Sequence, residues 1–97
     1  MSEQLEPIHP GEHLAEFLEE HRLSQYRAAQ DMSIPPRRLN EIVLGKRGIS
    51  ADTALRLARY FGTTPQFWMN LQDRYEVETA QAALGDRLDR EVRPLGG

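Results

Sequence analysis

Two adjacent arginines, Arg37 and Arg38, fall in the first turn of a predicted helix. Pro36 disfavours helical geometry at Pro35 and itself fits the first helical position, so the helix should begin at Pro36. The N-terminal end of a helix carries partial positive charge, which disfavours cationic side chains. An external anion would explain both arginines, since a guanidinium group matches a phosphate or the acceptor edge of guanine. The pair therefore points to nucleic acid, and surface solubility is the weaker alternative.

More polar side chains surround this pair, and we call the predicted helix over residues 36–44 the reading helix. Glu41 lies four residues after Arg37, where it can pair with that guanidinium or accept from a cytosine amine. Asn40 can contact an adenine edge or a phosphate. Gln25 can bind a phosphate or brace a base-reading side chain, and the loop after the reading helix suits non-specific phosphate contacts. The remaining candidates for DNA contact are Tyr26, Arg27, Lys46 and Arg47.

The charge distribution agrees with a local phosphate-facing patch. The 97 residues carry a formal net charge of −3, which argues against a non-specific nucleic-acid coat. Residues 1–22 hold six acidic residues and one arginine, whereas residues 23–49 hold five basic and two acidic residues. A basic block in an acidic chain is typical of a binding patch, although a solvated face without a partner gives the same pattern.

Other chemistry has little support. Cysteine is absent, which excludes disulfides and thiolate catalysis within this sequence. His9 and His13 have a metal-compatible helical spacing, but no clear third ligand accompanies them. The sequence shows no pattern that would place a general base beside a nucleophile, so we expect no enzyme activity. We also expect no metal and no cofactor. No apolar run approaches the roughly 20 residues of a membrane span, and no signal peptide is evident, so a cytoplasmic location is the default expectation.

Periodicity and capping residues predict an all-α fold of five helices. The helices should begin near Pro10, Ser24, Pro36, Ser50 and Thr64, and the last should end at Leu84. Gly45 suits a left-handed cap after the reading helix. We expect a flexible arm over residues 1–8, a DNA-binding domain over 9–84 that includes a C-terminal dimerisation helix, and a tail over 85–97. The inner face of the fourth helix is predicted to hold Ala54, Leu55, Ala58 and Phe61.

The fifth predicted helix carries large apolar side chains that suit either core packing or an interface. Because one reading helix covers only about four base pairs, useful specificity requires more than one copy. A homodimer would place two reading helices about 34 Å apart over a palindrome. We expect the fifth helix and the tail to form the dimer seam or a partner groove, and the candidate interface residues are Phe67, Trp68, Leu71 and Tyr75.

Two short helices joined by a tight turn, the second with a polar outer face, form the helix-turn-helix pattern. The arrangement resembles the lambda-repressor-like domains. A narrower resemblance is carried by segments 8–12 (IHPGE), 23–25 (LSQ), 40–42 (NEI), 45–47 (GKR), 52–58 (DTALRLA), 61–63 (FGT) and 67–72 (FWMNLQ). Together these segments resemble the HigA family of antitoxins from bacterial toxin–antitoxin modules, over about residues 8–78.

The resemblance implies a homodimeric repressor of its own operon that also neutralises a RelE-like, mRNA-cleaving toxin of the HigB kind. Two alternatives remain: a stand-alone helix-turn-helix regulator without a toxin, and an antitoxin that binds only protein. Ser33 stands where the family usually has glycine, and a left-handed serine there costs on the order of 1 kcal/mol. The acidic first helix would complement a basic ribonuclease, or it is simply a solvated face; its carboxylates are Glu12, Glu16, Glu19 and Glu20.

Overall fold

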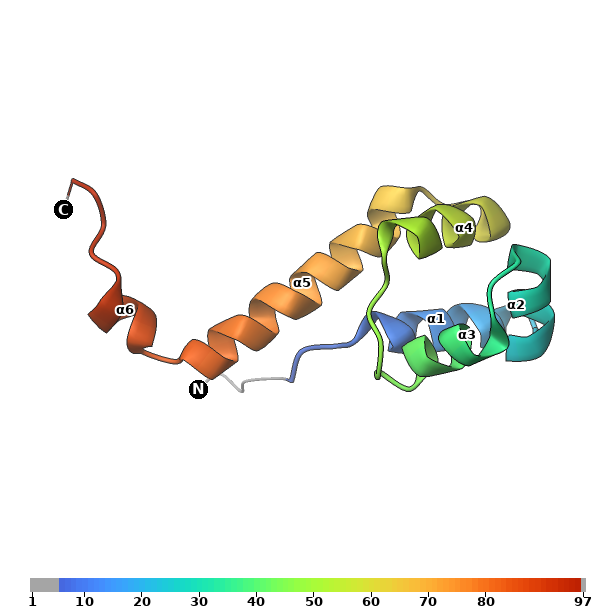
Figure 1. The fold of residues 1–97 in the computed structure, drawn as a ribbon, viewed down its shortest axis with the longest axis horizontal. Coiled ribbons are helices and arrows are strands. Elements are labelled where there is room, and N and C mark those ends of the chain that lie inside the picture. The colour runs from blue at the N-terminus through green and yellow to red at the C-terminus, as the bar shows by residue number, and fades with distance from the viewer. Residues whose placement is uncertain (1–5, 97) are drawn as a thin grey trace.

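The computed structural model describes residues 6–96, which contain six α-helices and no strand (Figure 1). Residues 6–9 precede the first helix without regular structure, and the first five residues of the predicted arm lie outside the described range. The all-α prediction is confirmed. The helices are α1 (Pro10–Glu20), α2 (Gln25–Met32), α3 (Pro36–Val43), α4 (Ala51–Phe61), α5 (Pro65–Leu84) and α6 (Arg87–Glu91).

The sixth helix, α6, was not expected in the tail. Arg87 pairs with Glu91 at 3.0 Å, and Arg90 pairs with Asp86 at 3.3 Å, each at the i,i+4 spacing that supports a helix. None of the α6 side chains is buried. The tail therefore holds one short charged helix whose side chains are all exposed.

The helix starts predicted from capping residues are confirmed. Each cap side chain accepts a hydrogen bond from a backbone N–H of the first turn, which satisfies a donor that the helix itself leaves free. The cap atoms are His9 Nδ1 for α1, Ser24 Oγ for α2, Ser50 Oγ for α4 and Thr64 Oγ1 for α5, at 2.9 to 3.3 Å.

One hydrophobic core lies between α1–α4 and the first half of α5, with Trp68 as its largest fully buried side chain. The predicted inward position of Leu55 is wrong, because its side chain is 59% exposed while Leu57 is completely buried. Ala54, Leu57 and Ala58 follow the i, i+3, i+4 spacing of a single helical face, and Leu55 falls about 100° away from it.

Close packing fixes the reading helix, α3, against α1. An added Cβ at Gly11 would lie 1.9 Å from the carbonyl oxygen of Ile42, so only glycine permits this approach. Leu39 and Ile42 are completely buried on the same side of α3. The opposite side of α3 is therefore presented outward at a fixed angle.

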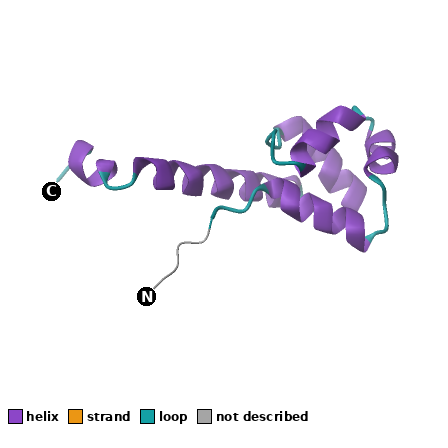
Figure 2. Cartoon of the chain, turned by 90° about the horizontal axis from the view of Figure 1, so that it is seen from below, coloured by secondary structure: helices purple, strands orange, loops and turns teal. Residues whose placement is uncertain are grey.

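Helix α5 leaves the bundle after its first half. Trp68 and Gln72 are its buried residues, and beyond Glu76 nearly every side chain is exposed. Figures 1 and 2 show this half projecting as a single rod, with α6 at its far end. The chain is consequently elongated, 52 Å long and 21 Å in its shortest dimension.

Candidate DNA-binding surface

The turn between α2 and α3 depends on a left-handed residue. Ser33 has φ 56° and ψ 43°, so the serine adopts the strained left-handed conformation considered from the sequence. The backbone N–H of Ser33 donates to Gln30, and that of Ile34 donates to Ala29. Ile34 is almost fully buried beneath the turn. This closure lets α3 cross α2 as the second helix of a helix-turn-helix pair.

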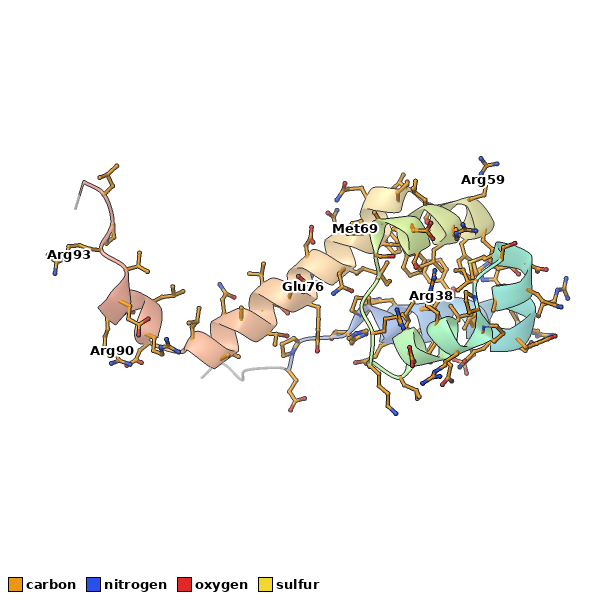
Figure 3. The ribbon with its side chains drawn as sticks, viewed as in Figure 1. Arg38, Arg59, Met69, Glu76, Arg90 and Arg93 are labelled. Carbon is orange, nitrogen blue, oxygen red and sulfur yellow. The ribbon has the colours of Figure 1, made fainter. Side chains whose placement is uncertain are left out.

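The outward face of α3 carries the polar side chains predicted to contact DNA. The Arg37 side chain is 90% exposed, and Asn40 is also exposed. The Arg38 side chain is 34% exposed and turns toward α4, where its Nη1 lies 3.7 Å from Asp52 Oδ1 (Figure 3). The two arginines therefore occupy different environments, one largely in solvent and one against the next helix.

Glu41 binds two arginines at once. Its carboxylate accepts from Arg37 Nε at 3.2 Å, the i,i+4 pair considered from the sequence, and from Arg47 Nε at 2.9 Å. The hydrogen bonds from Arg47 first and Arg37 second hold the pKa of Glu41 below its usual value. The contact with Arg47 could not be predicted from the sequence, because the loop folds back across the end of α3.

Gln25 contacts the reading helix directly. Its Oε1 accepts from Asn40 Nδ2 at 3.0 Å, so it braces a candidate base-reading side chain. The adjacent Tyr26 is 62% exposed, and Arg27 pairs with Asp31 at 3.2 Å. Of these three side chains, Gln25 hydrogen-bonds a residue of α3.

A pocket of about 300 Å³ continues this surface between the turn and α4. Arg56 lies in it, pairs with Asp52 at 2.8 Å and donates to the carbonyl oxygen of Met32 at 3.0 Å. Its position agrees with a surface ion pair on α4. The lining residues of the pocket are Ser33, Arg38, Arg47, Gly48, Ser50, Asp52, Thr53 and Arg56.

The α3–α4 loop, residues 44–50, carries Lys46 and Arg47, and both are exposed. Gly45 has φ 78°, which confirms the predicted left-handed cap. Farther along the loop, the backbone N–H of Ile49 donates to Gln72 Oε1 at 2.7 Å. No role was predicted for Gln72 from the sequence. Its position four residues after Trp68, on the buried side of α5, was the available signal.

The four candidate interface residues do not share one environment. Trp68 is completely buried, and its indole N–H donates to Thr63 at 2.8 Å, so of the two roles considered from the sequence it has the core role in this chain. Phe67 is 37% exposed. Leu71 and Tyr75 are half-buried, and the Tyr75 ring packs edge-on to His9 with 4.8 Å between ring centroids.

Exposed apolar side chains also lie beyond the bundle. Val77 on α5 and Leu88 on α6 are 56% and 44% exposed, and Val92 and Leu95 follow in the tail. Within residues 6–96 no group of three or more histidine or acidic side chains is placed to hold a metal ion. The same residues include no helix with the length and apolar character needed to cross a membrane.

Comparisons with known proteins agree with this geometry. A family described as helix-turn-helix matches residues 14–68. Virulence-associated protein I of Dichelobacter nodosus is 47% identical over 79 residues, which cover 80% of this chain and 73% of that protein. A solved antidote protein of the HigA family from Coxiella burnetii is 48% identical with a TM-score of 0.90, covering 94% of this chain and all of that chain.

A second solved structure is the Pseudomonas aeruginosa antitoxin HigA with the higBA promoter. It is 50% identical with a TM-score of 0.88, and the match covers 92% of this chain and 98% of that one. Identity of this extent over nearly the whole length reaches well beyond the shared fold. The chain belongs to the helix-turn-helix family and, within it, to the HigA antitoxins.

Proposed function

We propose that the chain is the antitoxin of a toxin–antitoxin module and represses its own operon by binding the promoter as a homodimer. One observation carries the proposal: α3 presents Arg37 and Asn40 outward while its other side is locked into the core. These two side chains do not pack in the core, so contact with an external ligand would explain their placement. The solved Pseudomonas HigA with its promoter is consistent with DNA as that ligand.

In this proposal α3 enters the major groove. Arg37 is the better base reader, because its guanidinium is largely in solvent and Glu41 limits its orientation. Arg38 lies nearer the sugar–phosphate backbone, beside the start of α4. The other contacts go to phosphates and fix the protein on the duplex. They come from Gln25, Tyr26, Arg27, Lys46 and Arg47.

The projecting half of α5 and the tail form the homodimer seam in this proposal. Val77, Leu88 and Val92 are exposed apolar side chains there, and burying each against a second copy would stabilise the pair. A two-fold arrangement would set two α3 helices one turn of DNA apart, about 34 Å, and would match a palindromic operator.

The toxin partner is proposed to be a RelE-like ribonuclease that meets α1. Glu12, Glu16, Glu19 and Glu20 are all exposed on this helix. Within residues 6–96, none of them forms an ion pair with a basic side chain. Such a face complements a basic protein.

Two experiments test the proposal. Binding of the purified chain to its own promoter and to a scrambled fragment of equal length should differ by at least about a thousandfold, and log affinity should fall by about 0.9 per phosphate contact for each log unit of salt. Equal binding to both fragments would show that the chain is not a sequence-specific repressor.

Co-expression with the adjacent gene should yield a complex and relieve toxicity. If the product of the adjacent gene is not toxic and does not co-purify, the chain is a stand-alone regulator without a toxin partner.

A further inference from the structure

Gln72 is a buried polar side chain whose amide is engaged at both ends. It is only 6% exposed. Its Oε1 accepts from the Ile49 backbone N–H at 2.7 Å, and its Nε2 donates to Glu76 Oε2 at 2.7 Å. Burial of an amide costs free energy unless its hydrogen bonds are replaced, so this placement requires both partners. The hydrogen bond to Ile49 joins α5 to a loop 23 residues away in sequence.

Glu76 sets which end of the amide faces the loop. Because its carboxylate only accepts, it selects the Nε2 end of Gln72 and leaves Oε1 toward Ile49. Figure 3 shows Glu76 on α5 where the helix leaves the bundle. The amide therefore has one defined orientation and serves as a directed acceptor for the loop.

The loop is shaped to receive this amide. A Cβ added at Gly48 would lie 2.8 Å from Gln72 Nε2 and 3.0 Å from Cδ and Oε1. Gly48 is not among the glycines with positive φ, so its backbone would tolerate alanine. The absence of a side chain at this position is thus explained by the packed amide of Gln72.

Helix α5 contacts one end of the segment that bears the basic side chains directly, and the other end only by way of His9. At the far end, Gln72 holds Ile49. At the near end, the His9 ring lies 3.7 Å from a Cβ added at Gly45 and packs against Tyr75. Lys46 and Arg47 lie between these two anchors. The Ile49 end of their segment is consequently held by α5, whereas their side chains remain exposed.

We propose that Gln72 is a positioning residue for DNA binding. It fixes the α3–α4 loop so that Lys46 and Arg47 meet phosphates, and it links that loop to the helix that carries the proposed dimer seam. This role rests on the proposed function, since DNA is the ligand whose phosphates the loop would meet. Gln72 itself touches no DNA; it acts through the backbone of Gly48 and Ile49.

The test replaces Gln72 with methionine, which keeps the length and helix preference of the side chain but removes both hydrogen bonds. Gln66→Met is the matched control, because Gln66 lies exposed on the same helix. We expect Q72M to bind the promoter about fivefold more weakly. Its salt slope should be smaller by about 0.9 for each phosphate that the loop no longer reaches. The Ile49 amide should exchange with deuterium faster, while the sedimenting mass stays that of the wild type.

Gly48→Ala approaches the same hydrogen bond from the loop, because the added Cβ displaces the amide of Gln72. It should reproduce the smaller salt slope. If Q72M does not fold, Gly48→Ala alone tests the positioning role of Gln72. Wild-type affinity and salt slope in a folded variant with faster Ile49 exchange would overturn the positioning role. Failure of the proposed function looks different, since the wild-type protein itself would then not distinguish its promoter from a scrambled fragment.

Discussion

Asn40 of α3 and Gln25 of α2 are joined by a 3.0 Å hydrogen bond between their side-chain amides. Asn40 supplies the Nδ2 donor and Gln25 the Oε1 acceptor. Asn40 Oδ1 and Gln25 Nε2 take no part in this hydrogen bond and remain available to an external ligand. This pairing turns two flexible side chains into one unit with a defined acceptor on the reading helix and a defined donor beside it.

Alanine at either Gln25 or Asn40 should weaken promoter binding, because the remaining amide loses its brace. We expect the double variant to lose less than the sum of the single losses, with a coupling of about 1 kcal/mol. A double-mutant cycle with titrations of promoter DNA measures this coupling. Strictly additive losses would show that the two side chains act independently in the complex.

Arg37 and Arg38 should respond differently to alanine. Loss of the exposed Arg37 should cost about 1–3 kcal/mol at particular base pairs and relax preference there. Loss of Arg38, which lies beside Asp52, should weaken all sequences alike and reduce the salt slope by about 1, as should Lys46→Ala. A panel of promoter fragments with single base-pair changes separates the two outcomes. If both arginine variants bind the promoter normally, α3 is not the helix that reads the promoter.

Most of the fold could be predicted from local signals in the sequence. Ser24, Ser50 and Thr64 each cap the helix predicted after them, since a cap hydrogen bond spans only three residues. Contacts between segments that lie far apart along the chain could not be predicted from the sequence. Arg47 meets Glu41 because the loop turns back, and Gln72 meets Ile49 because α5 packs against the loop. Neither follows from spacing along the chain.

The candidate site divides in the same way. The polar face of α3 follows from helical periodicity, which places Arg37 outward and Asn40 on the flank of that face. The burial of Trp68 and the exposure of Leu55 depend on which side of each helix meets the core. Apolar residues crowd both sides of α4 and α5, so periodicity alone could not select the inner one.

Acidification should destabilise the protein through His9. Burial lowers the pKa of His9 below its ordinary 6.5, against a smaller opposing effect of Glu12. Its Nδ1 accepts from the Gly11 N–H, which requires an unprotonated ring nitrogen. The unfolded chain therefore binds the proton more tightly. The stability from neutral His9 is present above pH 6.5 and is lost as the pH falls through the lower, folded pKa.

Urea unfolding at about pH 7.5 and about pH 5.5 measures this loss, since both values lie above the carboxylate range. His9→Asn keeps a capping side chain that does not titrate over this interval. The variant should lose less stability than the wild type between the two pH values. An equal loss in both proteins would assign the pH dependence to other groups.

Glutamate at Val77 should dissociate the homodimer. The side chain is 56% exposed on the projecting half of α5, and a charge there would be buried and unpaired in the proposed seam. Leu55→Glu is the matched control, because Leu55 is similarly exposed but lies on α4 beside α2. Sedimentation should show monomers for V77E and dimers for L55E. Dimers in both variants would place the seam elsewhere.

Charge reversal on α1 should weaken toxin binding. Glu16, Glu19 and Glu20 are exposed and form no ion pair within the described chain, so their lysine variants disturb no internal ion pair. We expect the triple variant to bind the toxin at least about tenfold more weakly, mainly through slower association that depends strongly on salt.

The matched control replaces the same three residues with glutamine, which removes the negative charges without adding positive ones. This control should show a smaller loss in the same direction, because complementarity is lost but no repulsion is introduced. Association kinetics with the purified toxin at two salt concentrations separates the variants. Unchanged toxin affinity in the lysine variant would exclude α1 as the toxin surface and leave its carboxylates as a solvated face.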